Sequence, residues 1–263
     1  KFSDSIYGDI SVENNELDDF IVSRADGSPT YNFTVVVDDN DMSITHVIRG
    51  EDHISNTPKQ IILYEALGYD IPQFAHLPMI LGEDKKRLSK RHGATGVQEF
   101  RDKGFLNSAL VNYLALLGWN PGTEQELFSP GELTREFSID RVHKKGAVWD
   151  NQKLEWINQQ TILRMKNDDI LVQILNIDSQ WGEKQQEETL LSVIELMKPR
   201  SKTFVEFIDT TDYFFNDPKE YDQKTIRKRW NNFDVNELVN EYIQCLDSVE
   251  EWTVENVEVE LRN

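Results

Sequence analysis

A basic loop between Gly82 and Val97 can bind phosphate, because its sequence, GEDKKRLSKRHGATGV, is rich in lysine and arginine. Its basic residues are Lys85, Lys86, Arg87, Lys90 and Arg91. Such side chains on a loop can neutralise charge that develops on a transferring phosphoryl group or on a pyrophosphate leaving group. Glycines on both sides give the backbone the freedom that a closing loop needs. The residue types alone also allow an ordinary solvated loop, so both interpretations stay open.

A second candidate group is RGEDH, from Arg49 to His53. An arginine at the end of a buried strand can bind a carboxylate through two hydrogen bonds. The acidic pair that follows, Glu51 and Asp52, can accept hydrogen bonds from ribose hydroxyls. The alternative is a structural ion pair between Arg49 and a neighbouring carboxylate. Tyr31 is either a hydroxyl donor to a substrate or a half-buried core aromatic.

The elements around these groups predict a sheet with a crossover helix. Tyr31 opens a strand-like stretch, and the runs TVVVDD (34–39) and ITHVIRGED (44–52) follow it. Both runs are apolar and end in acidic residues, as expected of strands. A helix should follow, with Thr57 as N-cap, Pro58 in the first position and Gly68 just past the end. FAHLPMIL (74–81) then predicts a strand that runs directly into the basic loop. In such folds, ligands bind at the carboxyl ends of the strands.

After the basic loop, the patterns are mostly helical. Two helices broken at Gly104 are expected in residues 97–120, and another begins near Ser129 or Pro130. From residue 151 to the end only helical patterns occur, divided at Pro199 and Pro218. We therefore predict an α/β fold followed by an all-α part, with the sheet ending near residue 105 and the purely helical part beginning near 165.

Composition excludes several classes of protein. The chain of 263 residues is 38% hydrophobic and 29% charged, which is typical of a soluble globular protein. No apolar run is long enough to span a membrane, and no signal peptide is recognisable. One cysteine excludes an internal disulfide and a multi-cysteine zinc site. The net charge of −19 argues against non-specific nucleic-acid binding, but not against a specific nucleic-acid partner.

Four stretches together resemble bacterial-type glutamyl-tRNA synthetase, a class I aminoacyl-tRNA synthetase. They are DGSPTYNFTVVVDDNDMSITHVIRGEDHISNTPKQIILYEALG, FAHLPMILGEDKKRLSKRHGA, GFLNSALVNYLALLGWN and RVHKKGAVWDNQKLEWINQQTI. Within the second stretch, KRLSKR stands where this family carries its version of the KMSKS loop. The resemblance is specific over residues 18–160 and looser in the helical tail.

The resemblance implies a division of the chain into four segments. Residues 1–20 would end the acceptor-binding insertion, and residues 21–54 would form the second half of a Rossmann-type catalytic domain. Residues 55–165 would be the stem-contact region that carries the basic loop. Residues 166–263 would be a helical anticodon-binding region, which we expect to be incomplete.

The resemblance also implies a reaction, in which glutamate and ATP form glutamyl-adenylate and the glutamyl group passes to the 3′ end of tRNA(Glu). Tyr31 and Arg49 would bind glutamate. The residues that would bind ATP are Asp52, His53, Met79, Ile80 and Lys90, with Mg²⁺ expected alongside the nucleotide. Lys90 would act on the phosphates with Arg87 and Ser89. The residues that would contact tRNA are Lys153, Arg200 and Lys202. No metal ligand is implied in this chain, and we expect a cytoplasmic monomer.

Two departures from the family pattern bear on activity. Arg87 stands where many members carry lysine, which keeps the charge and changes the donor geometry. The half of the catalytic fold that carries the HIGH signature is missing here, so we expect this polypeptide alone to be inactive. Three alternatives stay open: an inactive tRNA-binding or regulatory module, a paralogue that glutamylates queuosine in tRNA(Asp), and glutaminyl-tRNA synthetase, whose β-barrel anticodon part the helical tail disfavours.

Overall fold

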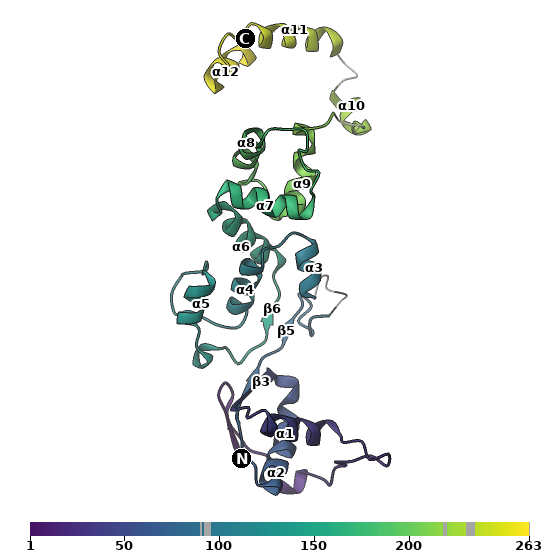
Figure 1. The fold of residues 1–263 in the computed structure, drawn as a ribbon, viewed down its shortest axis with the longest axis vertical. Coiled ribbons are helices and arrows are strands. Elements are labelled where there is room, and N and C mark those ends of the chain that lie inside the picture. Colours follow the sequence, from purple (N-terminus) through teal and green to yellow (C-terminus); the bar gives the residue numbers. More distant parts are fainter. Residues whose placement is uncertain (90, 92–95, 218–219, 230–234, 263) are drawn as a thin grey trace. The chain divides into compact units, whose positions relative to one another are not determined.

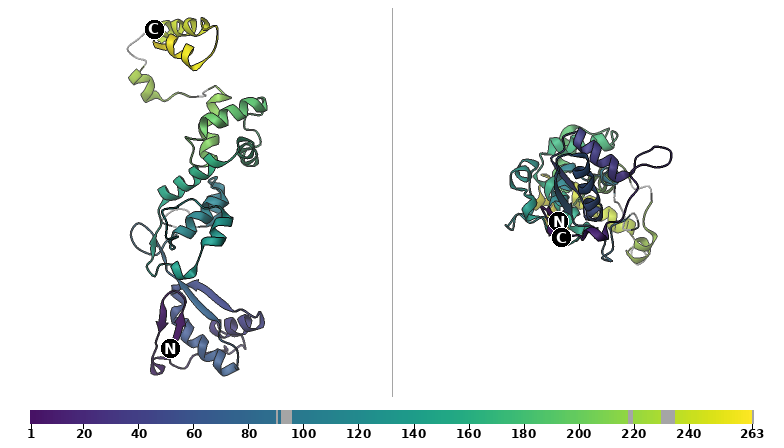
Figure 2. Two further views of the ribbon diagram at one scale, coloured as in Figure 1. Left: turned by 90° about the vertical axis from the view of Figure 1, so that its left-hand side faces the viewer. Right: turned by 90° about the horizontal axis from the view of Figure 1, so that it is seen from below.

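A four-stranded mixed sheet occupies the N-terminal part of the chain, in a computed structural model that describes residues 1–89, 91, 96–217, 220–229 and 235–262. The strands are β1 (Phe2–Asp4), β2 (Gly8–Ile10), β3 (His46–Gly50) and β4 (Gln73–Leu77). Their order is β2-β1-β4-β3, with β1 and β2 antiparallel and β4 parallel to both of its neighbours. The strands lie beside the N-terminus in Figure 2. Because β3 and β4 are parallel neighbours with helix α2 (Thr57–Leu67) between them in sequence, the predicted strand–helix–strand unit is confirmed.

The three consecutive valines lie in helix α1 (Tyr31–Asp41), so the prediction of a strand that begins at Tyr31 was wrong. The helix packs against α2 and the sheet (Figure 1), and Val36 is fully buried in a cluster with Leu63, Tyr64 and Phe74. β-Branched residues only weakly disfavour helix, and burial against a neighbouring helix easily outweighs that preference. Tertiary packing therefore decided this element.

Helix α2 begins one residue earlier than expected. Asn56 occupies the N-cap position without a side-chain cap, so the assignment of Thr57 as N-cap was wrong. The Thr57 side chain is fully buried and accepts a hydrogen bond from Arg49 instead. Gly68 ends the helix with a left-handed φ of 70°, as predicted.

The run FAHLPMIL forms two strands rather than one. After β4, Pro78 interrupts the run, and β5 (Ile80–Leu81) pairs in parallel with β6 (Ala147–Val148) in a separate sheet. The prediction that the sheet part ends near residue 105 was therefore wrong. A two-residue strand carries too little periodicity to be recognised in the sequence.

Four helices follow β5 in the sequence, the last of them after β6, and their order agrees with the prediction. They are α3 (Val97–Asp102), α4 (Asn107–Leu116), α5 (Pro130–Glu136) and α6 (Asn151–Arg164). Helices α4 and α6 lie side by side (Figure 1) and bury Leu110, Tyr113, Leu154 and Ile157. Ser129 caps α5 in a reciprocal capping box with Glu132, which confirms the predicted start.

Gly104 separates α3 from α4, and its backbone lies directly against the start of α9 (Phe204–Thr211). Its φ is +78°, and a Cβ placed there would lie 2.6 Å from the nitrogen of Val205 and 2.9 Å from that of Phe204. The Phe204 N–H also donates to the Gly104 carbonyl at 3.1 Å. The glycine therefore permits both the turn and the close contact between segments.

We expect Gly104→Ala to lower the free energy of unfolding by about 2 kcal/mol, because it adds backbone strain and a backbone clash. The matched control is Gly118→Ala, where a Cβ meets nothing within 4 Å, and we expect a change within about 0.5 kcal/mol. Chemical denaturation of both variants measures the difference. Equal stability of the two would contradict this reading of the turn.

The remainder of the chain is helical wherever the structure describes it, apart from connecting turns. The whole chain divides into two compact units. The first unit, Lys1–Asp212, ends with α7 (Asn167–Ile177), α8 (Glu187–Met197) and α9, which share a buried core. The second unit, Tyr213–Asn263, contains α10 (Gln223–Arg229), α11 (Val235–Asp247) and α12 (Val254–Arg262). In the described part of the chain, short 3₁₀ helices lie at Asn14–Glu16, Glu51–Asn56, Ile139–Arg141 and Asp212–Phe214. An α/β fold followed by an all-α part is thus confirmed.

No described helix has both the length and the apolar character needed to cross a membrane. The four segment boundaries suggested by the resemblance remain predictions.

Candidate active site

Arg49 lies near the carboxyl end of β3, where its guanidinium is held by three buried acceptors. Its Nε donates to Nε2 of His76 at 3.1 Å, and its Nη2 donates to Oγ1 of Thr57 and to Oε1 of Gln60, both at 2.8 Å. Thr57 and Gln60 reach it because α2 begins soon after β3 ends. These bonds use the Nε hydrogen and both Nη2 hydrogens, which leaves those of Nη1 for the Tyr31 hydroxyl or for an incoming carboxylate.

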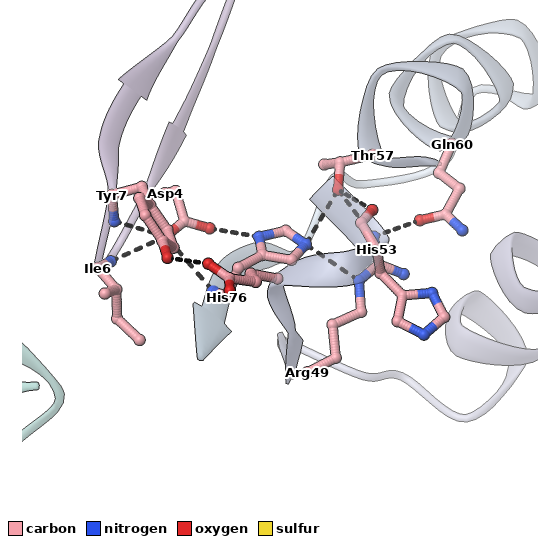
Figure 3. A network of polar contacts seen from close by, with 9 residues as sticks. Asp4, Ile6, Tyr7, Arg49, His53, Thr57, Gln60 and His76 are labelled. Carbon is pink, nitrogen blue, oxygen red and sulfur yellow. Dashed lines mark hydrogen bonds and ion pairs between the residues drawn. The ribbon is translucent and has the colours of Figure 1, made fainter. Parts of the chain in front are cut away.

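His76 connects Arg49 to a buried carboxylate, as Figure 3 shows. Its Nδ1 lies 2.6 Å from Oδ2 of Asp4, and both side chains are fully buried. Burial opposes ionisation of Asp4, but hydrogen bonds from the Tyr7 N–H, the His76 ring and the Ile6 N–H outweigh it, so the pKa of Asp4 is lowered. Burial lowers the pKa of His76, although Asp4 opposes this effect. The pair is therefore an ionised carboxylate beside a neutral imidazole.

Tyr31 and His53 complete the exposed side of this cluster. The Tyr31 hydroxyl lies 3.3 Å from Nδ1 of His53, and half of the Tyr31 side chain is exposed. Burial lowers the pKa of Arg49, and the neighbouring Tyr31 hydroxyl partly offsets this effect. The two residues predicted to bind glutamate, Tyr31 and Arg49, therefore lie together, and His53, predicted to bind ATP, lies beside them.

Glu51 joins the end of β3 to the segment that precedes the basic loop. Its Oε1 accepts a hydrogen bond from the Met79 N–H at 2.9 Å, and its Oε2 accepts one from the Tyr7 hydroxyl. Burial and Glu51 raise the pKa of Tyr7 to about 12, so this phenol stays protonated. The Ile80 carbonyl accepts from the Leu88 N–H at 2.8 Å. The Met79 N–H and the Ile80 carbonyl, which belong to two residues predicted to bind ATP, are therefore already paired.

The basic loop folds back along β5, and this brings Arg87 to the second candidate group. An isolated bridge pairs Arg87 with Leu81, and Nη2 of Arg87 lies 3.3 Å from Oδ2 of Asp52. Ser89 is half-buried. Lys90 lies outside the described residues, as do residues 92–95. The structure thus unites the two groups that the sequence identified separately, through one arginine–carboxylate contact.

The candidate tRNA contacts lie on and near α6. Nζ of Lys153 pairs with Oε1 of Glu126 at 2.5 Å and lies 4.3 Å from the centre of the Trp156 ring. Nζ of Lys202 pairs with Oε2 of Glu155 at 2.7 Å, and that hydrogen bond raises the pKa of Lys202. Arg200 is exposed. Each lysine already has a carboxylate partner that a phosphate would have to displace.

Sequence reasoning missed four polar residues of the network that holds Arg49 and Met79, namely Asp4, Tyr7, Gln60 and His76. It named Glu51 and Thr57 but gave them other roles, as a ribose acceptor and a helix cap. One signal was present, because His76 stands alone among apolar residues in FAHLPMIL, and a histidine in a buried strand needs a polar partner. Among the described residues, no group of three or more His, Cys, Asp or Glu side chains is arranged to hold a metal ion.

Comparisons with known proteins agree on one family. A family model described as "tRNA synthetases class I (E and Q), catalytic domain" matches residues 1–156, and a model described as "Anticodon binding domain" matches residues 160–263. Glutamate–tRNA ligase 1 of Caldanaerobacter subterraneus subsp. tengcongensis is 44% identical over 250 residues, which are 94% of this chain and 52% of that protein. Glutamate–tRNA ligase 2 of Halorhodospira halophila is 44% identical over 255 residues, which are 97% of this chain and 54% of that protein.

A solved structure extends the agreement to the fold. The crystal structure of a glutamate tRNA ligase from Elizabethkingia meningosepticum, in complex with its amino acid, superposes with a TM-score of 0.84 at 34% identity. The match covers 99% of this chain and 55% of that one. The chain spans about half the length of the curated relatives it matches. With a catalytic-domain model over its sheet and an anticodon-binding model over its helical tail, the chain belongs to the class I tRNA synthetases of the glutamate and glutamine (E and Q) family.

Proposed function

We propose that the protein carrying this chain is a glutamate–tRNA ligase. A carboxylate oxygen of glutamate attacks the α-phosphorus of ATP and expels pyrophosphate, which gives glutamyl-adenylate. The terminal ribose of tRNA(Glu) then attacks the activated carbonyl carbon and releases AMP. The observation that best supports this proposal is the fixed guanidinium of Arg49 beside the Tyr31 hydroxyl, a suitable receptor for a carboxylate.

In this proposal, the cluster around Arg49 binds the amino acid and the neighbouring segments bind the nucleotide. Tyr31 and Arg49 hold glutamate, while Asp52 and His53 lie at the rim of the nucleotide. Met79 and Ile80 lie along the adenine, which would meet groups of this segment other than the Met79 N–H and the Ile80 carbonyl.

The basic loop would act on the phosphates. Lys90 would neutralise the charge on the departing pyrophosphate, with Ser89 assisting, and Mg²⁺ bound with ATP would supply further positive charge. Arg87 exchanges its contact with Asp52 for a phosphate oxygen. We further propose that the protein is a cytoplasmic monomer.

The experiment is glutamate-dependent ATP–pyrophosphate exchange by the full-length protein in the presence of tRNA. Robust exchange that requires glutamate, followed by charging of tRNA(Glu), supports the ligase. Binding of tRNA without exchange would instead indicate an inactive binding module. Charging of tRNA(Asp) at its queuosine would indicate the paralogue.

For tRNA binding, we expect Lys153→Ala and Lys202→Ala each to weaken affinity and to reduce the salt slope by about one, because a phosphate contact releases a counterion. The same measurement on Arg200→Ala tests the third candidate. Lys184→Ala is the charge-matched control, on an exposed turn between α7 and α8. Affinities measured over a salt series decide the matter. If the salt slopes of these variants equal that of the control, the three residues do not contact tRNA phosphates.

A further inference from the structure

Among the described groups that we propose to meet substrate, the buried Asp4–His76 pair contacts Arg49 and no other. Asp4 lies on β1, His76 on β4 and Arg49 on β3, which are three adjacent strands of the sheet. Their polar atoms form a continuous line across the sheet, 2.6 Å from Asp4 to His76 and 3.1 Å from His76 to Arg49 (Figure 3). A buried polar pair of this kind is costly unless every member is satisfied.

The partners of His76 determine where its proton resides. Nε of arginine can only donate, so Nε2 of His76 must be an unprotonated acceptor. The ring proton is therefore on Nδ1 and is donated to the Asp4 carboxylate. Oδ1 of Asp4 is held in turn by the N–H groups of Ile6 and Tyr7, both at 2.9 Å. The carboxylate thus selects the tautomer that can accept from Arg49.

This acceptor completes the restraint on the guanidinium. Thr57 and Gln60 hold Nη2, and Gln60 is itself anchored by donating to Oδ1 of Asn32 at 3.0 Å. His76 accepts from Nε of the same guanidinium. Because both Nε and Nη2 are held, the guanidinium plane cannot rotate, and Nη1 points in one fixed direction towards an incoming carboxylate.

We propose that Asp4 and His76 are positioning residues, which hold Arg49 in the orientation that binds the carboxylate of glutamate. The inference rests on the proposed function, because it takes Arg49 as the receptor for glutamate. It assigns neither residue a contact with substrate. It predicts that they set the affinity for glutamate and leave the affinity for ATP unchanged.

A matched pair of amide variants tests this in the full-length protein. The oxygen of glutamine in His76→Gln can take the place of Nε2 and accept from Arg49, whereas the shorter asparagine in His76→Asn reaches only towards Asp4. In Asp4→Asn, the new amide would donate to Nδ1 and shift the ring proton to Nε2, against the Arg49 donor. The control is His46→Asn on the exposed side of β3.

The readouts are the KM values for glutamate and for ATP in ATP–pyrophosphate exchange. We expect His76→Asn and Asp4→Asn to raise the glutamate KM about tenfold or more, and His76→Gln less than about threefold, as the loss of one buried acceptor implies. The ATP KM should stay within about twofold, and the control should not differ from the unmodified protein. Equal effects of the two His76 amides, or parallel changes for glutamate and ATP, would show a merely structural pair and overturn the inference.

Two further measurements separate the possible failures. If the unmodified protein shows no glutamate-dependent exchange, or if Arg49→Lys leaves the glutamate KM unchanged, the proposed function or the role of Arg49 fails instead. If the variants do not fold, ¹⁵N NMR of the imidazole in the unmodified protein decides. A proton on Nδ1 with bare Nε2 supports the inference, and a proton on Nε2 contradicts it.

Discussion

Arg49→Ala is expected to raise the KM for glutamate in ATP–pyrophosphate exchange by about 100-fold, because it removes the half-buried charged partner of a carboxylate. Three hydrogen bonds hold this guanidinium before substrate arrives, so the orientation is prepared in the free protein. The KM for ATP should change little, because the nucleotide is proposed to lie beyond Asp52.

Two further variants sharpen this test. Arg49→Lys should recover only a small part of the loss, because one ammonium cannot hold both the Nε and the Nη2 positions. Arg101→Ala removes an exposed arginine that pairs with its neighbour Asp102 and should leave both KM values unchanged. An Arg49→Ala variant with an unaltered glutamate KM would remove Arg49 from the site.

Lys90→Ala is expected to lower the rate of glutamyl-adenylate formation roughly 100- to 1,000-fold, the usual cost of losing one group that stabilises transition-state charge. The KM for glutamate should change far less, because the lysine is proposed to act on phosphates that carry extra charge only as pyrophosphate leaves. Lys90 lies outside the described residues, so this prediction rests on the sequence. Pre-steady-state measurement of adenylate formation gives the rate.

The neighbouring Arg87 offers an internal comparison. Its contact with Asp52 gives it a carboxylate partner before ATP arrives, and the exchange of partners reduces its net contribution. Arg87→Ala should therefore slow adenylate formation less than Lys90→Ala does. The control is Lys103→Ala, an exposed lysine after α3. A rate for Lys90→Ala equal to that of this control would remove Lys90 from the phosphate site.

Local signals in the sequence predicted much of the fold. The break at Gly104, the helix start at Ser129 and the end of α2 at Gly68 each depend on a few adjacent residues, and each is present. The strand–helix–strand unit followed in the same way from turn residues and periodicity. Likewise, the order of the motifs along the chain is enough to indicate the synthetase family.

Tertiary structure decided what depends on distant residues. Helix α1 owes its form to the burial of Val36 against α2 and the sheet, which outweighs the strand preference of three valines. Strand β6 forms because β5 pairs with it. In that pairing Ile80 lies opposite Ala147, which is 67 residues later in the sequence. Neither effect is encoded in a local pattern.

The same distinction between local and distant residues applies to the candidate site. The sequence by itself determined which side chains can bind a carboxylate or phosphate, because Tyr31, Arg49 and the basic loop stand in recognisable motifs. Only the tertiary structure placed Asp4 and His76, 72 residues apart, against each other and His76 against Arg49. Their pairing arises from the side-by-side order of β1, β4 and β3, and hydrogen bonds between neighbouring strands connect residues whose separation along the chain carries no signal.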